Sequence, residues 1–131
     1  GKNDPHNGYG PNSFIKLEKK NKDIKIFGKG EERRDHIHVD DVGNAIYVLI
    51  SKKYVGTINL VTGKAISFYK IAQKIKDIYK VKLKYLKRKG PMPHNGYRAF
   101  NESLLKKILL KKNNFIDIFE WIHKKEKYKK K

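Results

Sequence analysis

The sequence predicts a small α/β domain, and three observations support this. The chain has 131 residues, the length of a single domain, and 38% of them are hydrophobic, enough to bury a core. Apolar residues recur at helical spacing in some segments and form short β-prone runs in others. These two kinds of segment alternate along the chain without an internal repeat, which is typical of α/β architecture.

The amino-terminal segment predicts one helix and one strand. Residues 1–13 are rich in Gly, Pro, Asn and Asp, so we expect an irregular loop. A short helix with a lysine-rich outer face follows over residues 14–22, with Asn12 or Ser13 as its N-cap. Residues 24–27 are β-prone and lead into two glycines, which predicts a strand followed by a tight turn.

A second strand and a second helix are expected next. Apolar and polar residues alternate over residues 35–39, which predicts a short strand. Asp40 and Asp41 are acids suited to a helix N-terminus, and apolar residues follow them at helical spacing. We expect this helix to end near Lys52 and Lys53, because cations stabilise a helix C-terminus.

The second half of the chain continues the alternation. Residues 56–61 predict a buried strand, and Ser67 is a suitable N-cap for the most regular helical stripe, over residues 68–79. Residues 81–86 alternate apolar side chains with lysine, as a half-buried strand does. After a loop with two prolines, further helices are expected over residues 104–109 and 115–122.

The chain is strongly basic. It has 32 lysines and arginines against 13 acids, a net charge of +19, which attracts nucleic acid, anionic membranes or phosphorylated ligands. All but four of these basic residues are lysines, whereas arginine suits bidentate phosphate and base contacts. We therefore interpret the charge mainly as a solvated lysine surface. Residues 1–122 are assigned to one domain, and residues 123–131 to a lysine-rich tail expected to be disordered.

Several classes of protein are excluded by composition. Because there is no cysteine, the chain has no disulfide, no cysteine zinc site and no thiol catalysis. No apolar run approaches the ~18 residues of a membrane span, and no signal segment opens the sequence. We therefore expect a cytoplasmic location and no membrane partner. The first residue is Gly1 rather than methionine, so we expect a piece of something longer or a trimmed chain.

The segment from Gly28 to Val42 is the most informative part of the sequence. Its glycine turn lets the backbone approach a ligand closely, and two adjacent arginines, Arg33 and Arg34, follow that turn in sequence. The planar fork of an arginine fits a phosphate or diphosphate. Asp35 follows directly, and it is expected either to orient one guanidinium or merely to hold the turn through an Arg–Asp pair.

This segment resembles a recurrent stretch of the NAD-dependent epimerase/dehydratase family, the extended short-chain dehydrogenases that act on nucleotide sugars. In that family, glycine, any residue, glycine and a few polar residues precede Arg-Asp, an aromatic, Ile-His-Val, and then Asp-Asp-Val at a helix start. His36 stands where the aromatic residue is usual. The matching residues are Gly28, Gly30, Arg34, Asp35, Ile37, His38, Val39, Asp40, Asp41 and Val42.

The flanking segments extend the resemblance over about residues 1–122. Residues 9–12 are similar to the loop that continues from a Tyr-Gly-Pro-like turn, and residues 56–63 resemble a Gly-x-x-Tyr/Phe-Asn-Ile/Leu-x-x-Gly strand. Residues 67–72 resemble the Ser-x-x-Glu-Leu/Ile-Ala helix that follows it. Residues 98–106 resemble an Arg-x-x-Asp-x-Ser-Lys element, with asparagine in place of the aspartate.

The resemblance implies both a fold and a role. In this family an amino-terminal Rossmann half binds NAD or NADP and carries the catalytic Tyr-x-x-x-Lys. A smaller carboxy-terminal α/β half holds the nucleotide diphosphate of the sugar. The chain would then be the small C-terminal substrate domain of an extended short-chain dehydrogenase, lacking the Rossmann half. Its implied partners are a nucleotide sugar and a Rossmann domain in the same or a separate chain.

The resemblance also implies which residues bind substrate. Arg34 matches the family arginine that contacts the diphosphate, and Arg98 matches a second phosphate-contacting arginine. Lys25 and Phe27 lie on the strand beside the nucleotide base, where an aromatic ring can stack. Asn12 lies in the substrate-side loop. The acids expected to orient Arg34 or to cap the helix are Asp35, Asp40 and Asp41.

The sequence carries no sign of the hydride chemistry itself. No G-x-x-G-x-x-G follows a strand, so we expect this chain alone to bind no cofactor, although NAD or NADP belongs to the complete enzyme. Tyr85 and Lys89 fit Tyr-x-x-x-Lys by spacing, but they fall on a predicted strand and we interpret the match as chance. We expect no catalytic residue here, whether the chain is a fragment, a split subunit or a remnant.

Two alternatives are weighed against this interpretation. His36, His38 and Asp40 share a predicted strand face and would suit zinc, but no fourth ligand is evident and we expect no metal. The other alternative is a lysine-rich basic module that binds nucleic acid or an acidic partner. For that role, Tyr128 among the tail lysines offers base stacking beside phosphate contacts.

Overall fold

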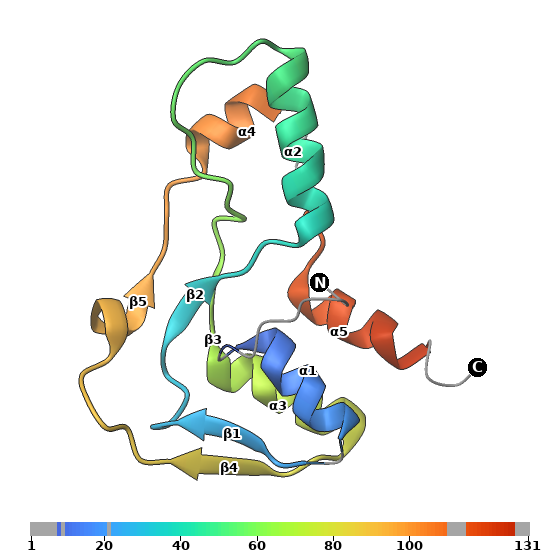
Figure 1. Ribbon diagram of the computed structural model, residues 1–131, viewed down its shortest axis with the longest axis vertical. Helices are drawn as coiled ribbons and strands as arrows, with labels where there is room; N and C mark the ends of the chain where they lie inside the picture. The colour runs from blue at the N-terminus through green and yellow to red at the C-terminus, as the bar shows by residue number, and fades with distance from the viewer. Residues whose placement is uncertain (1–7, 9, 21, 110–114, 128–131) are drawn as a thin grey trace.

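The computed structural model describes residues 8, 10–20, 22–109 and 115–127, and it has two parts joined by a small sheet (Figure 1). The lower part, which we call the core lobe, contains α1 (Pro11–Lys19), β1 (Ile24–Phe27), α3 (Phe68–Tyr79), β4 (Leu83–Leu86) and α5 (Ile118–Lys127). The upper part, which we call the arm, contains α2 (Val39–Ser51), residues 52–62 and α4 (Ser103–Leu109). Between them lie β2 (Arg33–Asp35), β3 (Ala65–Ser67), the short 3-10 helix η1 (Pro93–Gly96) and β5 (Tyr97–Arg98).

The core lobe holds the hydrophobic core. The predicted apolar stripe of α3 is confirmed, and Ile71 and Ile75 are fully buried. They pack in one cluster with Phe14 of α1 and Ile122 of α5. Each large apolar side chain buried in this way contributes roughly 1.5–3 kcal/mol to stability. Ser67 caps α3 as predicted, because its side-chain oxygen accepts a hydrogen bond from a backbone N–H of the first turn at 3.2 Å.

The predicted first strand is confirmed as β1, which pairs in parallel with β4. Ile24 and Ile26 are fully buried, so Lys25 and Phe27 point to the opposite, exposed face of the strand. The turn after β1 requires glycine at Gly30, which has a φ of +71°. A Cβ there would lie 2.7 Å from the Cγ2 of Ile26 and would disturb the core.

The sheet that joins the two parts has the order β3-β2-β5. β2 pairs antiparallel with β3 and parallel with β5. The strand expected over residues 35–39 is therefore displaced to residues 33–35. Asp35 is the last residue with a partner on β3, so the ladder ends there and the chain continues into α2 without further strand pairing.

The strand expected over residues 56–61 does not form. The segment descends from the end of α2 towards β3 without regular secondary structure (Figure 1), and no described strand pairs with it. Of its side chains only Val61 is buried. A β-prone sequence becomes a strand only where a neighbour accepts its backbone hydrogen bonds. The strand forms instead at β3, which lies beside β2.

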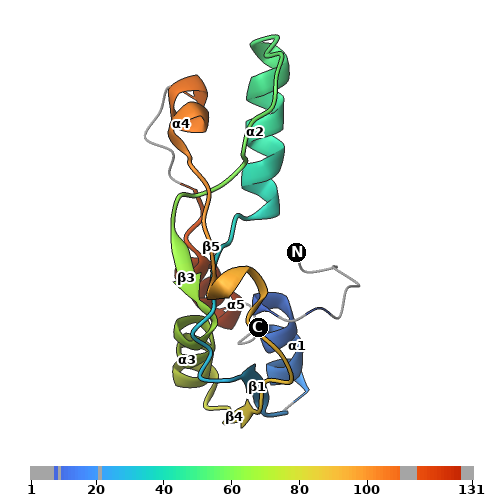
Figure 2. The same cartoon turned by 90° about the vertical axis from the view of Figure 1, so that its left-hand side faces the viewer.

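In the arm, α2 and α4 pack against each other, as Figures 1 and 2 both show. Ala45 of α2 and Leu105 of α4 are buried. The predicted end of α2 is confirmed, since Lys52 is its C-cap. The helix begins at Val39, one residue before the expected acids. His38 caps it, with Nδ1 accepting from a backbone N–H in the first turn at 3.2 Å.

Two helix boundaries differ from expectation. α1 begins at Pro11 with Gly10 as N-cap, and no side chain caps it. Proline suits the first helical position because the N–H it lacks has no partner there. The last helix begins at Ile118 rather than at residue 115, because the Asp117 carboxylate accepts from the Phe119 backbone N–H at 2.8 Å.

The last helix also runs further than expected. α5 extends to Lys127, five residues into the segment predicted to be a disordered tail, and residues 128–131, with Tyr128, lie outside the described residues. The loop predicted over residues 1–13 lies mostly outside them too. None of the described helices has the length and hydrophobicity of a membrane span.

Candidate functional site

Two arginines that are distant in sequence are neighbours in the central sheet. Arg34 of β2 and Arg98 of β5 are directly paired in the parallel ladder. Paired residues on adjacent strands project to the same face, so both guanidinium groups belong to one face of the sheet. Arg33 and Tyr97 form the preceding pair and project to the other face, where the Arg33 guanidinium lies 5.6 Å from the Tyr97 ring centre.

The Arg34 guanidinium is fixed by three acceptors. It donates to the backbone oxygen of Arg33 at 2.8 Å and to that of Pro93 at 3.1 Å. It also pairs with the Glu32 carboxylate at 3.5 Å, and only 18% of its side chain is exposed. Because a guanidinium has five N–H donors, an arginine held in this way still has donors to offer to an anion.

Glu32 is a residue of the site that sequence analysis missed. Its side chain is only 7% exposed, and its two oxygens pair with different guanidinium groups, those of Arg34 and Arg88. Arg88 also donates to the backbone oxygen of Phe27 at 3.4 Å. This bond connects β1 to the arginine cluster, by which we mean Arg34, Arg88 and Arg98 together with Glu32. One carboxylate faces the two guanidiniums of Arg34 and Arg88, and Arg98 is paired with Arg34 in the ladder. The cluster therefore has an excess of positive charge that favours an anion. The available signal was an acid two positions before Arg34.

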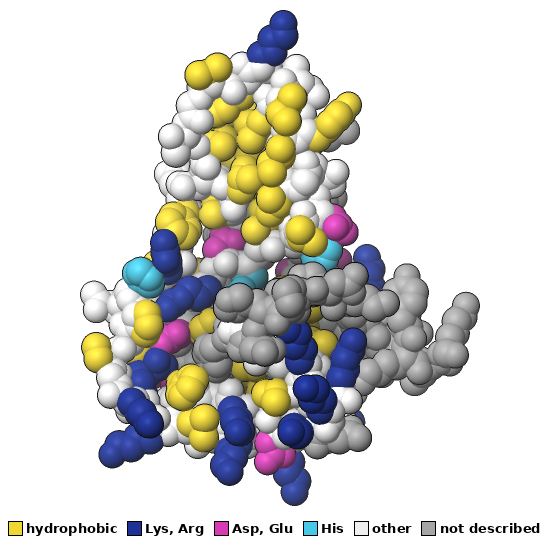
Figure 3. Space-filling view, in the orientation of Figure 1, with side chains coloured by type: hydrophobic (Ala, Val, Ile, Leu, Met, Phe, Trp, Pro, Cys, Tyr) yellow, Lys and Arg dark blue, Asp and Glu magenta, His cyan; other side chains and the backbone are white. Residues whose placement is uncertain are grey.

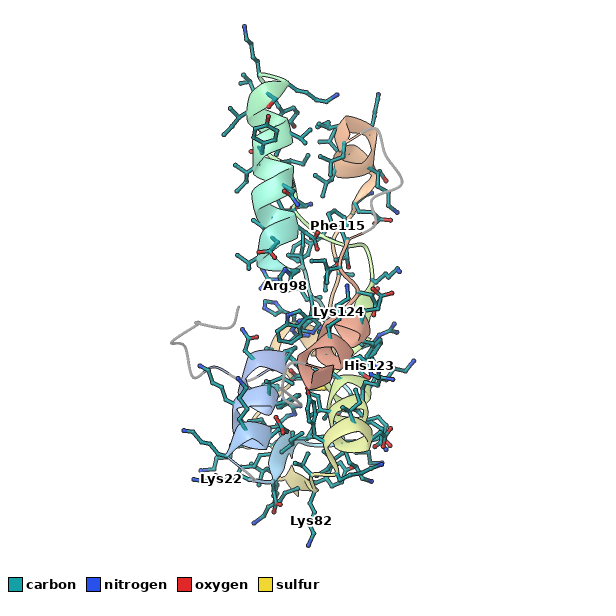
Figure 4. All side chains as sticks on the ribbon, turned by 90° about the vertical axis from the view of Figure 1, so that its right-hand side faces the viewer. Lys22, Lys82, Arg98, Phe115, His123 and Lys124 are labelled. Carbon is teal, nitrogen blue, oxygen red and sulfur yellow. The ribbon has the colours of Figure 1, made fainter. Side chains whose placement is uncertain are left out.

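Arg98 is held by the loop that precedes it. Its guanidinium lies 3.1 Å from Nε2 of His94 and 5.2 Å from the Phe100 ring centre. His94 and Asn95 both have left-handed φ angles, 54° and 51°, which cost non-glycine residues roughly 1–3 kcal/mol each. The same strained turn supplies a backbone acceptor to Arg34. Figure 4 shows Arg98 where the arm meets the core lobe.

The other predicted substrate-binding residues lie on the core lobe. Phe27 ends β1 with 37% of its surface exposed, and its backbone oxygen is the one that accepts from Arg88. Lys25 lies two residues earlier on the same exposed face. Asn12 lies in the first turn of α1, which packs on β1 and α3. β1 therefore leads from Lys25 through Phe27 to the arginine cluster.

Asp35 has a different role from the orientation of Arg34. Its carboxylate accepts hydrogen bonds from the Thr62 N–H at 3.0 Å, the Thr62 hydroxyl at 2.8 Å and the Gly63 N–H at 2.7 Å. Successive side chains of a strand point to opposite faces, so Asp35 turns away from the guanidinium that precedes it. Asp35 thus links β2 to Thr62 and Gly63, where the chain comes back from the arm. The acid that pairs with Arg34 is Glu32.

Asp40 and Asp41 both lie in the first turn of α2, where acids stabilise a helix N-terminus. Asp41 also accepts a hydrogen bond from the Ile116 N–H at 2.8 Å, which ties the arm to the segment before α5. The expectation that these acids orient Arg34 is corrected as well, because its described partners are Glu32 and two backbone oxygens.

The histidines face different neighbours. The ring of His36 packs edge-on against Phe68, with 5.8 Å between ring centres, whereas His38 caps α2 and lies against Trp121. Among the residues that the structure describes, no three His, Cys, Asp or Glu side chains are grouped to hold a metal ion. Tyr85 lies on β4 and Lys89 beyond its end, so this Tyr-x-x-x-Lys spacing is not on a helix.

Burial governs the titration of His36. Desolvation lowers its pKa below the ordinary value, the charge of Asp35 opposes this effect, and the charge of Arg34 adds to it. Its Nε2 is buried without a described hydrogen-bond partner. His36 is therefore neutral near pH 7 and acts as a packing residue rather than as a charged member of the arginine cluster.

Solved structures define the class of fold. The chain is similar to UDP-N-acetylglucosamine 4-epimerase from Methanobrevibacter ruminantium M1 in complex with UDP-N-acetylmuramic acid, with a TM-score of 0.77, 25% identity, and coverage of 98% of this chain and 41% of the epimerase. It is similar to dTDP-glucose 4,6-dehydratase from Bacillus anthracis in complex with NAD, with a TM-score of 0.71 and 18% identity, and the match covers 94% of this chain and 42% of the dehydratase. It is also similar to UDP-N-acetylglucosamine 4-epimerase from Bacillus cereus, with a TM-score of 0.63 and 22% identity, and the match covers 93% of this chain and 44% of that epimerase. The fold is thus the small mixed α/β arrangement that forms part of extended short-chain dehydrogenase epimerases, as the sequence predicts.

The sequence comparison agrees with the structural one. The model of the NAD dependent epimerase/dehydratase family matches residues 4–61, which include Arg34 and the whole of α2. No curated protein matches the chain. The chain spans about two fifths of the length of the solved structures that it matches.

Proposed function

We propose that this chain is the substrate-binding portion of an NAD(P)-dependent nucleotide-sugar epimerase or dehydratase, corresponding to the carboxy-terminal part of such an enzyme. The observation that carries the proposal is the pairing of Arg34 with Arg98 on one face of the β2–β5 ladder. Two fixed guanidiniums side by side match the two charged groups of a diphosphate.

The surroundings of this pair support a nucleotide as the ligand. Phe27 is exposed at the end of β1, next to the arginine cluster, and offers a ring face to a nucleobase. Lys25 lies on the same face and adds positive charge. The family model match at residues 4–61 and the similarity to a UDP-sugar-bound epimerase support the same ligand class.

The cofactor is assigned to the remainder of the enzyme. NAD(P) would supply hydride transfer at the sugar, and its pyrophosphate is usually cradled by a glycine-rich turn between a strand and a helix. Among the described residues, no glycine turn connects a strand end to a helix N-terminus. The part assigned here to the described residues is to hold the diphosphate and the base.

Binding of the diphosphate and the base assists the reaction at the sugar ring. The diphosphate and base take no part in bond changes at the sugar ring, but their binding energy fixes the ring in one position. Arg34 is suited to this task because Glu32 and two backbone oxygens hold it before substrate arrives. Such preorganisation reduces the entropy lost on binding.

Calorimetric titration with UDP-, dTDP-, GDP- and CDP-sugars tests the proposal. We expect saturable binding of one nucleotide class, weakened about 30- to 150-fold by Arg34→Ala, the loss of one charged hydrogen-bonding group. Arg98→Ala should weaken binding in the same direction. Arg33→Ala is the matched control, because it removes an equal charge from the opposite face of the same strand.

Two outcomes would contradict the proposal. One is equal affinity in the wild type and Arg34→Ala. The other is binding only to a random oligonucleotide added alongside, with an affinity that falls steeply with salt, which would favour the basic-module alternative.

A further inference from the structure

The turn that precedes β5 contacts both arginines of the proposed diphosphate site. This turn is η1, and two of its residues supply the contacts. The Pro93 backbone oxygen accepts a hydrogen bond from Arg34 at 3.1 Å. Nε2 of His94 lies 3.1 Å from a guanidinium nitrogen of Arg98. The family model match ends at residue 61, so it assigns no role to this turn or to its histidine.

The partner of His94 decides which form of the ring this structure holds. A guanidinium has N–H donors and no acceptor, so Nε2 of His94 accepts the hydrogen bond from Arg98 and carries no proton itself. A protonated ring would have no acceptor to offer and would repel the guanidinium. The contact therefore requires the neutral ring, which occupies a donor of Arg98 that a phosphate would otherwise use.

His94 lies where a ligand would arrive from solvent. His94 and Arg98 are both exposed, whereas only 18% of the Arg34 side chain is. Figure 3 shows histidine and basic side chains together at the surface where the arm meets the core lobe. A phosphate that reaches Arg98 from solvent thus comes close to the His94 ring as well.

The backbone of η1 is strained in a way that favours a role in binding. His94 and Asn95 have left-handed φ angles of 54° and 51°. Strain of this kind persists only where surrounding contacts hold it, and it is common at ligand clamps. Here those contacts include the hydrogen bonds to Arg34 and Arg98, so the arginines themselves hold the turn beside the site.

We propose that His94 is a further phosphate-binding residue of this site, and that its ring takes up one proton from solvent when a nucleotide sugar binds. This inference rests on the proposed function. A phosphate beside Arg98 brings negative charge close to Nε2, and a nearby opposite charge favours the protonated ring. The protonated Nε2 then donates to the phosphate and releases the Arg98 donor that it occupied.

The other charged groups near His94 keep their charge close to neutral pH. They are Arg98 on β5, Arg34 on β2, and Glu32 and Arg88, which belong to the same cluster. Both phosphates of a nucleotide sugar also have a constant charge there, unlike a phosphate monoester, which has a pKa of about 6. Histidine is the side chain that changes its charge between pH 5 and 8. Among these groups, a pH dependence of binding near neutrality therefore reports His94.

Linkage gives the sign of the pH dependence. The ligand-bound protein holds more protons than the free protein, so affinity rises as the pH falls. We expect nucleotide sugar to bind about tenfold more tightly at pH 6 than at pH 8, within the limit of tenfold per pH unit that one proton allows.

Calorimetric titration at pH 6, 7 and 8 tests the proposal, with whichever of the UDP-, dTDP-, GDP- and CDP-sugars binds the wild-type chain. At pH 7 the titration is repeated in Bis-Tris and in Tris, because their ionisation enthalpies differ and the change in observed heat counts the protons taken up. We expect uptake of about half a proton or more per ligand bound. Equal affinity at pH 6 and pH 8 without proton uptake would overturn the proposal.

One substitution and a matched control identify the group that takes up the proton. His94→Asn removes the titrating ring and retains a residue that adopts left-handed φ angles readily. It should abolish the proton uptake and the pH dependence. His123→Asn, at an exposed histidine of α5, should retain both. A pH dependence that survives His94→Asn, or that is lost in His123→Asn, would overturn the assignment to His94.

A measurement on the wild-type chain needs no variant to fold. In an NMR titration, the His94 ring protons should reach the shifts of the protonated ring at a higher pH when the nucleotide sugar is bound. An equal midpoint with and without the nucleotide sugar would overturn the proposal. Arg34-dependent binding without proton uptake would remove this inference and keep the proposed function, whereas no binding of any of the four sugars at any pH would remove both.

Discussion

The core lobe and the arm belong to one chain, but they differ in how far they bury their apolar side chains. The core lobe buries Phe14, Ile71 and Ile75 in one cluster and exposes lysines such as Lys22 and Lys82 at its far end (Figure 4). The arm buries little besides the contact between α2 and α4, and it leaves Ile46 and Ile50 of α2 exposed. The core lobe thus buries its large apolar side chains, whereas the arm leaves several of its own exposed. The arginine cluster lies between them, where a ligand would contact both.

The largest expected effect tests this contrast directly. Ile71→Ala, in the core lobe, should lower the free energy of unfolding by about 2–5 kcal/mol, because its side chain is fully buried. Ile50→Ala, the same substitution in the arm, should change it by less than about 0.5 kcal/mol. Urea unfolding measures both. Equal costs would mean that Ile50 is covered in solution.

The connection between the two parts should be nearly as sensitive. Asp35→Ala removes the acceptor of three hydrogen bonds from Thr62 and Gly63, so we expect a loss of about 2–3 kcal/mol in unfolding free energy. Asp35→Asn retains one carbonyl acceptor and should lose less. Heat denaturation of the two variants checks this order, and a neutral Asp35→Ala would show that the carboxylate does not hold the arm.

A smaller effect concerns the pH dependence of stability. Because the pKa of His36 is lowered by burial, the unfolded chain binds a proton more readily than the folded one. Stability should therefore be complete above the ordinary pKa of 6.5 and decline as the pH falls below it. His36→Phe removes the buried, unpaired Nε2 and should stabilise the fold by about 1 kcal/mol and flatten this decline. An unchanged pH profile in the variant would assign the decline to other groups.

The smallest effect concerns Gly43, in the middle of α2. Gly43→Ala should stabilise the isolated chain by about 0.5–1 kcal/mol, because alanine is the better helix former and its Cβ meets nothing. Thermal melting of the variant and the wild-type chain measures this gain, and a loss of stability in Gly43→Ala would contradict the open space above Gly43.

The core lobe was predictable from sequence because its signals are local. The stripe of α3, its cap at Ser67 and the alternation of β1 each concern residues close together, and each is confirmed. Residues 56–61 carried an equally local β-prone signal, but a strand depends on a neighbour, and the described chain supplies none. The error at this segment thus arises because no described strand accepts its backbone hydrogen bonds.

The site was predictable only in part. The resemblance singled out Arg34 and Arg98, and the ladder brings them together. Their support was not predictable, because the side chains of Glu32 and Arg88 meet only after β1, β2 and the chain beyond β4 have folded together. The sequence left Asp35 either to orient a guanidinium or to hold the turn. Its carboxylate bonds instead to Thr62 and Gly63, because adjacent residues of a strand project to opposite faces.

The most direct test of the account compares Arg34→Ala with Arg33→Ala in a calorimetric titration with the nucleotide sugar that binds the wild-type chain. The two variants have the same net charge and lose a guanidinium from opposite faces of β2. The Arg33 guanidinium donates to the Ala65 backbone oxygen at 2.9 Å and is not part of the arginine cluster. The account predicts that Arg34→Ala binds about 30- to 150-fold more weakly than Arg33→Ala, which should match the wild type. Equal weakening in both variants would mean that the lysine-rich surface, and not a site built on Arg34, attracts the ligand.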